Sequence, residues 1–442
     1  MATLVKTRSD GALLQGRQGL LPERNQEILS GAFFWLSAFY FFYCARPADS
    51  IPGLALIPLV KITLGLAALS LFSKSLKTSR RLKDLPREYS YLFILVILLF
   101  VSAVLSPVWR GGAFFGTMDF GKVGVVWAIT FLLVTSFQRL RRIIFIQSAS
   151  VAVVCFVAVA KGHSIPRLNG VLGGTYSNPN DLAFAIVLSL PFCLAFFLAA
   201  KSGPRKVLWC FAMLIMAVAL ILTASRAGFI DLVIAGVVCL WYFGVKGKRL
   251  YLIVATAFLG CVLLLVAGKT LMRRFAAFSG ENVTTAEEDS AYESYEERKL
   301  LMFRALSAIG HYPILGLGVG DFAVYSGRWK DVHASYLQIA AEGGIPVLIL
   351  YLMFFSRGFA NLKKLRKRKD LDDETKLFAG ALTSSLVGFA VGACFAPEAY
   401  QYFPYFTVCY TSVFLAMIRE REDSDISTTT LMPLPRRRFA QA

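Results

Sequence analysis

DLAFAIVLSLPFCLAFFLA runs from Asp181 to Ala199, and its only charged residue is the first one. A helix crosses the hydrocarbon core of a membrane in about 20 predominantly apolar residues, so this stretch is long enough to span. Its apolar residues do not alternate with polar ones, as they would in a strand of a membrane barrel. A helix is then the structure that satisfies its backbone hydrogen bonds in lipid. We therefore predict a transmembrane helix here.

Comparable apolar stretches recur along the chain, of which 56% is hydrophobic with a mean hydropathy of +0.59. This composition excludes a soluble or disordered protein. It predicts an all-α integral membrane protein with about twelve transmembrane helices. The predicted spans are Leu29–Ala45, Ile51–Phe72, Tyr89–Leu105, Gly121–Phe137, Ile143–Ala160, Asp181–Ala199, Val207–Thr223, Ala227–Gly244, Leu250–Gly268, Ser335–Phe355, Leu377–Phe395 and Pro404–Ile418.

Basic residues are distributed unevenly between the predicted loops. The chain has 47 lysines and arginines against 28 aspartates and glutamates, a formal net charge of +19. With the N-terminus in the cytoplasm, 32 of the 47 basic residues fall in cytoplasmic segments, as the positive-inside rule requires. The charge is thus mainly a signal of orientation, with both termini cytoplasmic, and it does not indicate nucleic-acid binding.

This orientation divides the chain into three parts. Residues 1–28 form a cytoplasmic N-terminal segment, residues 29–418 a polytopic membrane domain, and residues 419–442 a cytoplasmic tail predicted to be disordered. A long loop at about residues 269–334, between the ninth and tenth spans, falls on the periplasmic side. Loops of this length commonly carry function. Residues 161–180 form a second outside segment, rich in Gly, Asn, Pro and Ser.

The chain has three histidines, and His333 is the candidate catalytic one. It lies at the outer mouth of the tenth span, where an imidazole can remove a proton from a hydroxyl near neutral pH. The alternative is a histidine at a helix start that binds backbone or water. His311 precedes Pro313 at the end of a predicted helix, which favours a capping role. His163 has no assignment.

Arginines on the outer side are the second class of candidates. Arg226 directly follows the seventh span, where a charge is costly and indicates a function; its alternative is pairing with Asp231 or reaching the lipid headgroups. Arg298 lies in the long loop, and its alternative is a solvated helix face that balances neighbouring glutamates. Arg167 lies in the second outside segment. Arginines converging on one mouth would suit a phosphate or pyrophosphate, which guanidinium groups bind bidentately.

Two other patterns favour less specific interpretations. The run from Gly316 to Gly320 lies outside, follows no strand and lacks the lysine of a nucleotide-binding loop, so we interpret it as a turn. No pattern predicts a metal site. The intramembrane residues Lys61, Asp231 and Glu342 could form an ion or proton path, which keeps a transporter as the alternative class.

Four segments together resemble the bacterial O-antigen ligase and polymerase superfamily. They are Arg167 to Ala183 with Asn178-Pro179-Asn180-Asp181; Ser225-Arg226-Ala227-Gly228; Arg298 followed by Tyr312-Pro313-Ile314-Leu315-Gly316-Leu317-Gly318 and Phe322; and His333 followed by Glu342-Gly343-Gly344-Ile345-Pro346. Their order, their spacing and the long loop before the histidine carry the resemblance, which covers a core of about residues 165–356. Two positions depart from the family pattern: Ala334 replaces an asparagine and Met302 a tryptophan.

The resemblance implies an inner-membrane glycosyltransferase that needs no metal or other cofactor. Its donor would be a glycan on undecaprenyl pyrophosphate, with chemistry at the periplasmic face and inversion at the sugar carbon. His333, Arg298 and Arg226 would be the catalytic residues. The implied substrate-binding residues are Arg167, Asn178, Asn180, Arg304 and Glu342.

The acceptor stays open at this point. The lipid A core (a ligase), a growing polysaccharide (a polymerase of O-antigen or exopolysaccharide) and a protein side chain (an O-oligosaccharyltransferase) all fit, because the subfamilies share these motifs. We slightly favour the ligase. Besides these substrates, membrane lipids are the expected partners.

Overall fold

The computed structural model describes residues 23–51, 53–72, 80–162, 168, 176, 178–257, 286–368 and 370–430. All elements in these ranges are helical, which confirms the predicted all-α fold. The first half comprises α1 (Glu23–Ala45), α2 (Pro47–Ser50), η1 (Leu54–Leu56), α3 (Leu59–Phe72), η3 (Leu82–Asp84), α4 (Arg87–Val104), α5 (Arg110–Leu133) and α6 (Phe137–Lys161). The second comprises α7 (Pro179–Ala199), α8 (Gly203–Thr223), α9 (Arg226–Cys239) with the π-helical η5 (Leu240–Val245), α11 (Ala286–His311), α12 (Asp321–Tyr325), α13 (Ser335–Arg366), α14 (Asp373–Gly392) and α15 (Tyr402–Thr430).

Within these ranges, 8 helices are long and apolar enough to cross a membrane, and two shorter apolar helices accompany them. The chain is thus a multi-pass membrane protein; the count of twelve spans stays a prediction. The long spans are Arg87–Val104, Arg110–Leu133, Phe137–Lys161, Pro179–Ala199, Gly203–Thr223, Ala227–Val245, Ser335–Arg366 and Asp373–Gly392, and the shorter helices are Gly31–Ala45 and Leu59–Leu71.

The predicted second span, Ile51–Phe72, is not one continuous helix. A 3-10 turn, η1, lies in its first part, and α3 begins only at Leu59. Gly53 has a φ of 86°, a left-handed conformation that interrupts a helix, and Pro58 lacks the N–H that would continue one. Hydropathy alone does not detect these interruptions.

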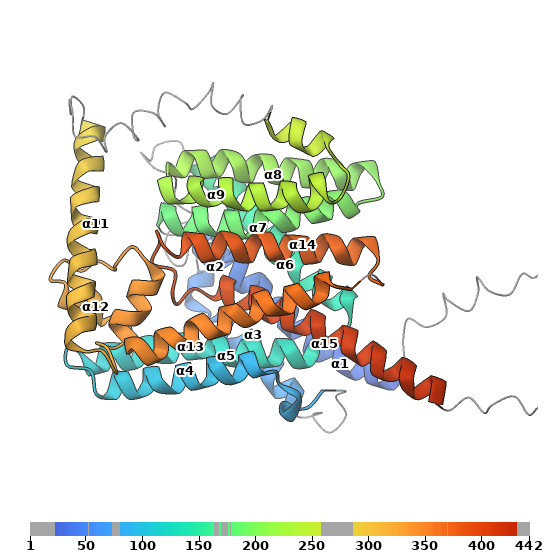
Figure 1. Ribbon diagram of the computed structural model, residues 1–442, viewed down its shortest axis with the longest axis horizontal. Helices are drawn as coiled ribbons and strands as arrows, with labels where there is room; N and C mark the ends of the chain where they lie inside the picture. The colour runs from blue at the N-terminus through green and yellow to red at the C-terminus, as the bar shows by residue number, and fades with distance from the viewer. Residues whose placement is uncertain are drawn as a thin grey trace, which may run out of the picture.

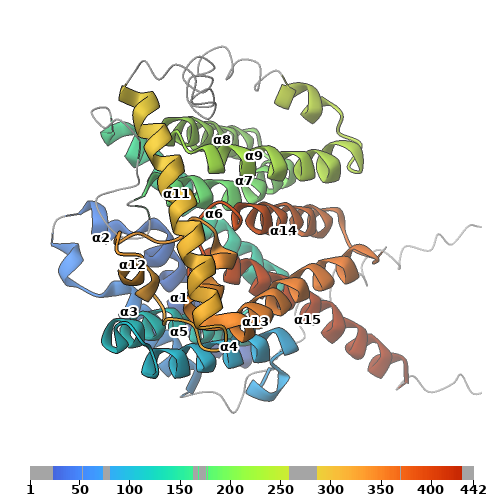
Figure 2. The ribbon, with the colours of Figure 1, turned by 60° about the vertical axis from the view of Figure 1, so that its left-hand side comes forward.

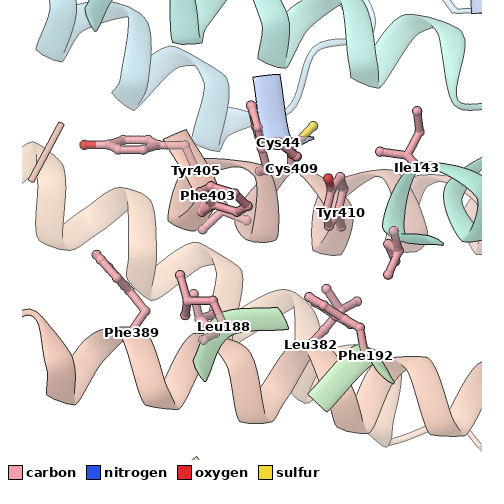
Figure 3. Close-up of a cluster of buried hydrophobic side chains, with 14 of the residues drawn as sticks. Cys44, Ile143, Leu188, Phe192, Leu382, Phe389, Phe403, Tyr405, Cys409 and Tyr410 are labelled. Carbon is pink, nitrogen blue, oxygen red and sulfur yellow. The ribbon is translucent and has the colours of Figure 1, made fainter. Parts of the chain in front are cut away.

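The helices form one bundle in which segments distant in sequence lie side by side (Figure 1). α14 packs against both α7 and α9, α13 packs against α4 and α15, and α1 packs against α6. Large side chains fill the space between α7, α14 and α15, where Phe192, Phe389 and Tyr405 are almost completely buried (Figure 3). The bundle therefore has a continuous apolar core, which holds the ends of its helices in fixed relative positions.

The two ends of the bundle differ. One end, which we call the outer end, carries α12 and the start of α13, and α11 crosses it at a steep angle to the other helices (Figures 1 and 2). The opposite, inner end joins segments that the sequence places in the cytoplasm. There Arg80 pairs with Glu420 at 2.6 Å, and Arg141 pairs with Glu374 at 2.7 Å.

The C-terminal boundary differs from the prediction. α15 continues past Ile418 to Thr430, although residues from 419 onward were expected to be disordered. Arg80 and Arg368 bind Glu420 and Glu422 in the first turn of this extension. Residues 431–442 lie outside the described residues.

Candidate active site at the outer end of the bundle

His333 lies two residues before α13, in a segment tied to the loop between α14 and α15. The Ser335 N–H donates to the Ala393 carbonyl at 2.7 Å, and the Ser335 hydroxyl donates to the Ala396 carbonyl at 2.7 Å. The same hydroxyl accepts from the Glu398 N–H at 2.9 Å. These three bonds fix the first turn of α13, and with it the backbone that carries His333.

The positive charge of Arg298, on α11, acts on His333. Burial, followed by the positive charge of Arg298, lowers the pKa of His333 to about 4, so the imidazole is neutral at neutral pH and can accept a proton. The His333 Nδ1 and the Arg298 Nε are both buried and lack a hydrogen-bond partner among the described residues. Burial also lowers the pKa of Arg298. A neutral base and a partly desolvated cation therefore act on each other electrostatically, and each has a buried nitrogen without a partner among the described residues.

The glutamates next to Arg298 pair with lysines instead. The Lys330 Nζ donates to the Glu297 Oε2 at 2.6 Å, and the Lys299 Nζ lies 3.9 Å from the Glu296 Oε1. Neither neighbouring carboxylate is thus the ion-pair partner of Arg298. This disfavours the interpretation that Arg298 only balances them on a solvated helix face.

A small apolar cluster holds α11 in place. Leu301, Ala305 and Ala308 of α11 are fully buried against Leu317, Phe322 and Val332. These α11 residues recur at intervals of three and four, so they share one face of the helix. Arg298 precedes Leu301 by three residues and therefore lies on the same face, turned toward the bundle.

The start of α9 is bonded to the start of α7. The Ser225 hydroxyl accepts from the Gly228 N–H at 3.1 Å as an N-cap, and it donates to the Asn180 amide oxygen at 2.9 Å. Asn178 caps α7 by accepting from the Asn180 N–H at 2.9 Å. Arg226 is the first residue of α9, so these contacts set the position of its backbone.

Gly228 brings these two helices into close contact. A Cβ at Gly228 would lie 2.6 Å from the Cβ of Ala183, nearer than carbon atoms approach without repulsion. The two motifs Asn178–Asp181 and Ser225–Gly228 thus form one local structure. Asn178 and Asn180, predicted to bind substrate, have their side chains engaged in it.

The glycine-rich segment after α11 pairs with α13 where that helix is broken. The Leu317 and Gly318 N–H groups donate to the carbonyls of Ala341 and Glu342 at 2.9 and 2.8 Å, and the Ile345 N–H donates to the Pro313 carbonyl at 2.8 Å. Gly316, Gly318 and Gly320 have φ values of 67°, 101° and 80°. These glycines form a turn, as predicted.

Gly344 makes the break in α13 possible. Its φ of 80° and ψ of 175° are non-helical, and a Cβ on it would lie 2.3 Å from the Ile314 carbonyl oxygen. Only glycine fits here without moving the backbone. The carbonyls freed by the break are the ones that accept from the glycine-rich segment.

Asp321 and Glu342 anchor this segment from both sides. Asp321 accepts from the Ser106 hydroxyl at 2.6 Å and from the Trp109 N–H at 3.1 Å, which ties α12 to the turn between α4 and α5. Glu342 is fully buried, and one of its oxygens accepts from the Phe322 N–H at 3.4 Å. Glu342 thus lies beneath the outer end, and a role in binding substrate stays a prediction.

Sequence reasoning missed a group of carboxyl side chains at this end. Asp181 and Glu398 line the same small cavity. Burial, followed by the charge of Asp181, raises the pKa of Glu398 well above its usual value, and Asp231 adds to this effect. These residues belong to three separate segments, and Asp181 alone fell within a recognised motif.

The remaining predicted residues lie in varied settings. Arg304 is half-buried, near the position that a Cβ on Gly327 would occupy. The His311 Nδ1 lies 2.8 Å from the Ser307 carbonyl oxygen, in keeping with a role at the helix end.

Arg167 and His163 lie outside the described residues. Asp231 is almost fully buried, whereas Lys61 is exposed on α3. Among the described residues, no group of three His, Cys, Asp or Glu side chains could hold a metal ion.

These features define a multi-pass membrane protein whose polar candidate site lies at one end of its helical bundle. Residues 211–352, from within α8 to within α13, match the O-antigen ligase family. This match confirms the resemblance to the family, and it includes Arg226, Arg298 and His333 but not the segment from Arg167 to Ala183. The match covers about a third of the chain and supports the O-antigen ligase superfamily, and with it an O-antigen ligase- or polymerase-like membrane glycosyltransferase that acts on lipid-linked glycans. No curated protein matches the chain.

Proposed function

We propose that the protein transfers a glycan from undecaprenyl pyrophosphate to an acceptor hydroxyl at the periplasmic face of the bacterial inner membrane. One observation carries this proposal: the half-buried Arg298, which pairs with neither Glu296 nor Glu297, acts through its positive charge on the neutral imidazole of His333. This pair combines an anion-binding group with a base. It lies at the end of the bundle where α11 crosses the helix ends.

In the proposed reaction, His333 takes the proton from the acceptor hydroxyl. The acceptor oxygen forms a bond to the sugar carbon as the bond from that carbon to the pyrophosphate oxygen breaks, with inversion. Arg298 and Arg226 bind the departing pyrophosphate, and Arg167 helps to position the donor. Fixed cations in a site that excludes water stabilise the developing charge without the cost of reorganising solvent. No metal is required in this scheme, and transfer is expected to persist in excess chelator.

The proposal is tested with purified full-length protein, an undecaprenyl-pyrophosphate oligosaccharide and candidate acceptors, followed by identification of the product. His333→Ala, Arg226→Ala and Arg298→Ala are each expected to abolish transfer while the protein still accumulates in the membrane. Loss of a general base typically costs about 10²–10⁴ in rate. Full activity of the His333→Ala protein would exclude the mechanism.

For the acceptor we favour the lipid A core over a growing polysaccharide or a protein side chain. A deletion strain distinguishes the first two. Loss of a ligase leaves long polymer on the carrier lipid, whereas loss of a polymerase leaves single repeat units on it. Glycoprotein that disappears in the same strain would instead identify a protein O-oligosaccharyltransferase.

A further inference from the structure

An apolar groove runs along the membrane-facing side of the bundle between α1 and α6. Its volume is about 320 Å³, within the roughly 300–1,000 Å³ typical of small-molecule sites. The α6 wall consists of residues spaced three or four apart between Phe145 and Val157, which is one face of the helix. Phe41 and Ala45 of α1 form part of the opposite wall. The groove occupies the half of these helices nearer the outer end.

The groove walls are exposed although they are large and apolar. Phe41, Phe145 and Val153 are 45%, 44% and 56% exposed. Nearer the inner end, α1 and α6 meet through Arg139, whose guanidinium lies 5.1 Å from the centre of the Phe33 ring. The two helices are thus joined at one end and leave an apolar space toward the other. An apolar chain entering from the lipid would fill this space.

A cation lies at the outer end of the groove. Arg46 directly follows α1 and pairs with Asp49 at 2.5 Å, and its side chain remains 27% exposed. Its φ of 44° is unusual for a residue other than glycine and marks a backbone held by its surroundings.

Tyr176 connects the groove with the polar outer end. Its hydroxyl donates to the Cys44 carbonyl at the end of α1, at 2.9 Å. The same tyrosine lines a small cavity together with Asp181 and Glu398. The Glu398 N–H is bound by Ser335, two residues after His333. A lipid seated in the groove would therefore have its headgroup beside Arg46, and Tyr176 joins the end of α1 to the cavity lined by Asp181 and Glu398.

We propose that this groove holds the isoprenoid chain of the lipid carrier, with Arg46 binding the carrier's phosphate, as a loading position from which the headgroup reaches the outer end. The inference rests on the proposed function for the identity of the lipid. A membrane phospholipid or a helix of another protein are the competing occupants, and the experiment below separates them.

Binding is measured first, without any transfer reaction. Full-length protein with a photoreactive p-benzoylphenylalanine at Val153 is placed in nanodiscs, irradiated with undecaprenyl pyrophosphate and analysed by mass spectrometry. We expect an adduct with undecaprenyl pyrophosphate that excess unlabelled carrier suppresses and excess phosphatidylglycerol does not. The same group at Val237, which is 62% exposed on α9 and does not line the groove, should give no such adduct. Adducts only with phospholipid, or only with protein, would overturn the inference.

Transfer provides the second readout. Ala149→Phe narrows the groove, and Val237→Phe, at an exposed position on α9 outside the groove, is the control. Ala149→Phe should raise KM for the undecaprenyl-linked donor about tenfold, and KM for a donor on a short prenyl chain by less than about twofold. Equal increases in KM for both donors would contradict the binding of the isoprenoid chain in the groove. Val153→Trp, at a half-exposed site, replaces Ala149→Phe if that variant does not accumulate.

The charge is tested separately. Arg46→Gln should weaken crosslinking of undecaprenyl pyrophosphate at Val153, whereas Asp49→Asn, which removes the ion pair but keeps the cation, should not. Equal crosslinking by the Arg46→Gln and native proteins would exclude Arg46 as the phosphate ligand. If carrier crosslinks in the groove but no donor supports transfer, the proposed function fails while the binding site stands.

Discussion

The Ser225 hydroxyl donates a 2.9 Å hydrogen bond to the amide oxygen of Asn180. This bond joins the starts of α7 and α9, two helices separated in sequence by all of α8. Because Ser225 also caps α9, a single side chain both satisfies the first turn of that helix and fixes it to its neighbour. Arg226 follows directly, so its backbone has little freedom to shift.

Removing this hydroxyl should reduce transfer more than stability. Ser225→Ala loses the N-cap, which typically costs about 1 kcal/mol, and also releases the start of α9 from Asn180. We expect membrane accumulation close to that of the native protein, with kcat/KM for glycan transfer reduced about tenfold. The matched control is Ser202→Ala, since Ser202 precedes α8 without making a side-chain cap. Equal losses in both variants would argue against a positioning role for Ser225.

Transfer should persist to unusually low pH. Burial and Arg298 lower the pKa of His333 from 6.5 to about 4, with Lys330 acting in the same direction and Glu297 opposing. The imidazole therefore stays unprotonated as the pH falls, and kcat/KM should decline only near pH 4. In the same interval the unfolded chain binds a proton that the folded protein does not, so His333 makes the folded state less stable as the pH falls through it. A decline of kcat/KM with its midpoint near pH 6.5 would contradict the lowered pKa of His333.

Arg298 should not be replaceable by lysine. A lysine keeps the charge but loses the planar pair of donors that binds phosphate bidentately. We expect Arg298→Lys to lower kcat by about 10²–10³, the usual cost of removing a donor that stabilises the transition state. Lys299→Ala changes the adjacent exposed residue and should leave kcat unchanged. Comparable kcat values for the Arg298→Lys and native proteins would show that charge alone suffices.

The break in α13 should tolerate no side chain. Gly344→Ala would place a Cβ 2.3 Å from the Ile314 carbonyl oxygen, at a φ of 80°, so the glycine-rich segment must separate from α13. We expect a lower thermal unfolding temperature in detergent and poor accumulation. Gly310→Ala is the control, because no atom lies within 4 Å of its Cβ position and alanine favours a helix. An unfolding temperature as high as that of the native protein would contradict the tight fit at Gly344.

Hydropathy predicted the positions of most spans because a chain in lipid must satisfy its own backbone. The predicted span Asp181–Ala199 corresponds to α7 within two residues at its start. Local interruptions were predicted less well. Gly53 and Pro58 break the second predicted span, and the pair Gly343-Gly344 before Pro346 marks the break in α13. Both signals were present in the sequence, but neither changes the mean hydropathy.

The candidate site was predicted only as a set of separate motifs. The sequence indicated that Arg298 and His333 lie on one side, because both belong to the long loop. It could not show that Glu296 and Glu297 leave Arg298 unneutralised, since each could equally have paired with it. Glu398 carried no signal at all: it reaches Asp181 only because α14 and α7 pack together, and tertiary contacts of this kind are not encoded in local patterns.

The paired arginine at the inner end sets where the chain can be shortened or tagged. Arg80 is almost fully buried and donates to the carbonyls of Phe131 and Val134, and Glu420 provides its carboxylate. Ending the chain at Ile418 would remove the carboxylate that balances the charge of this buried guanidinium, and losing one member of a buried ion pair is destabilising. Purification tags and fluorescent fusions therefore belong beyond Thr430, where α15 ends, and a fusion at the predicted boundary would compromise the fold it was meant to report.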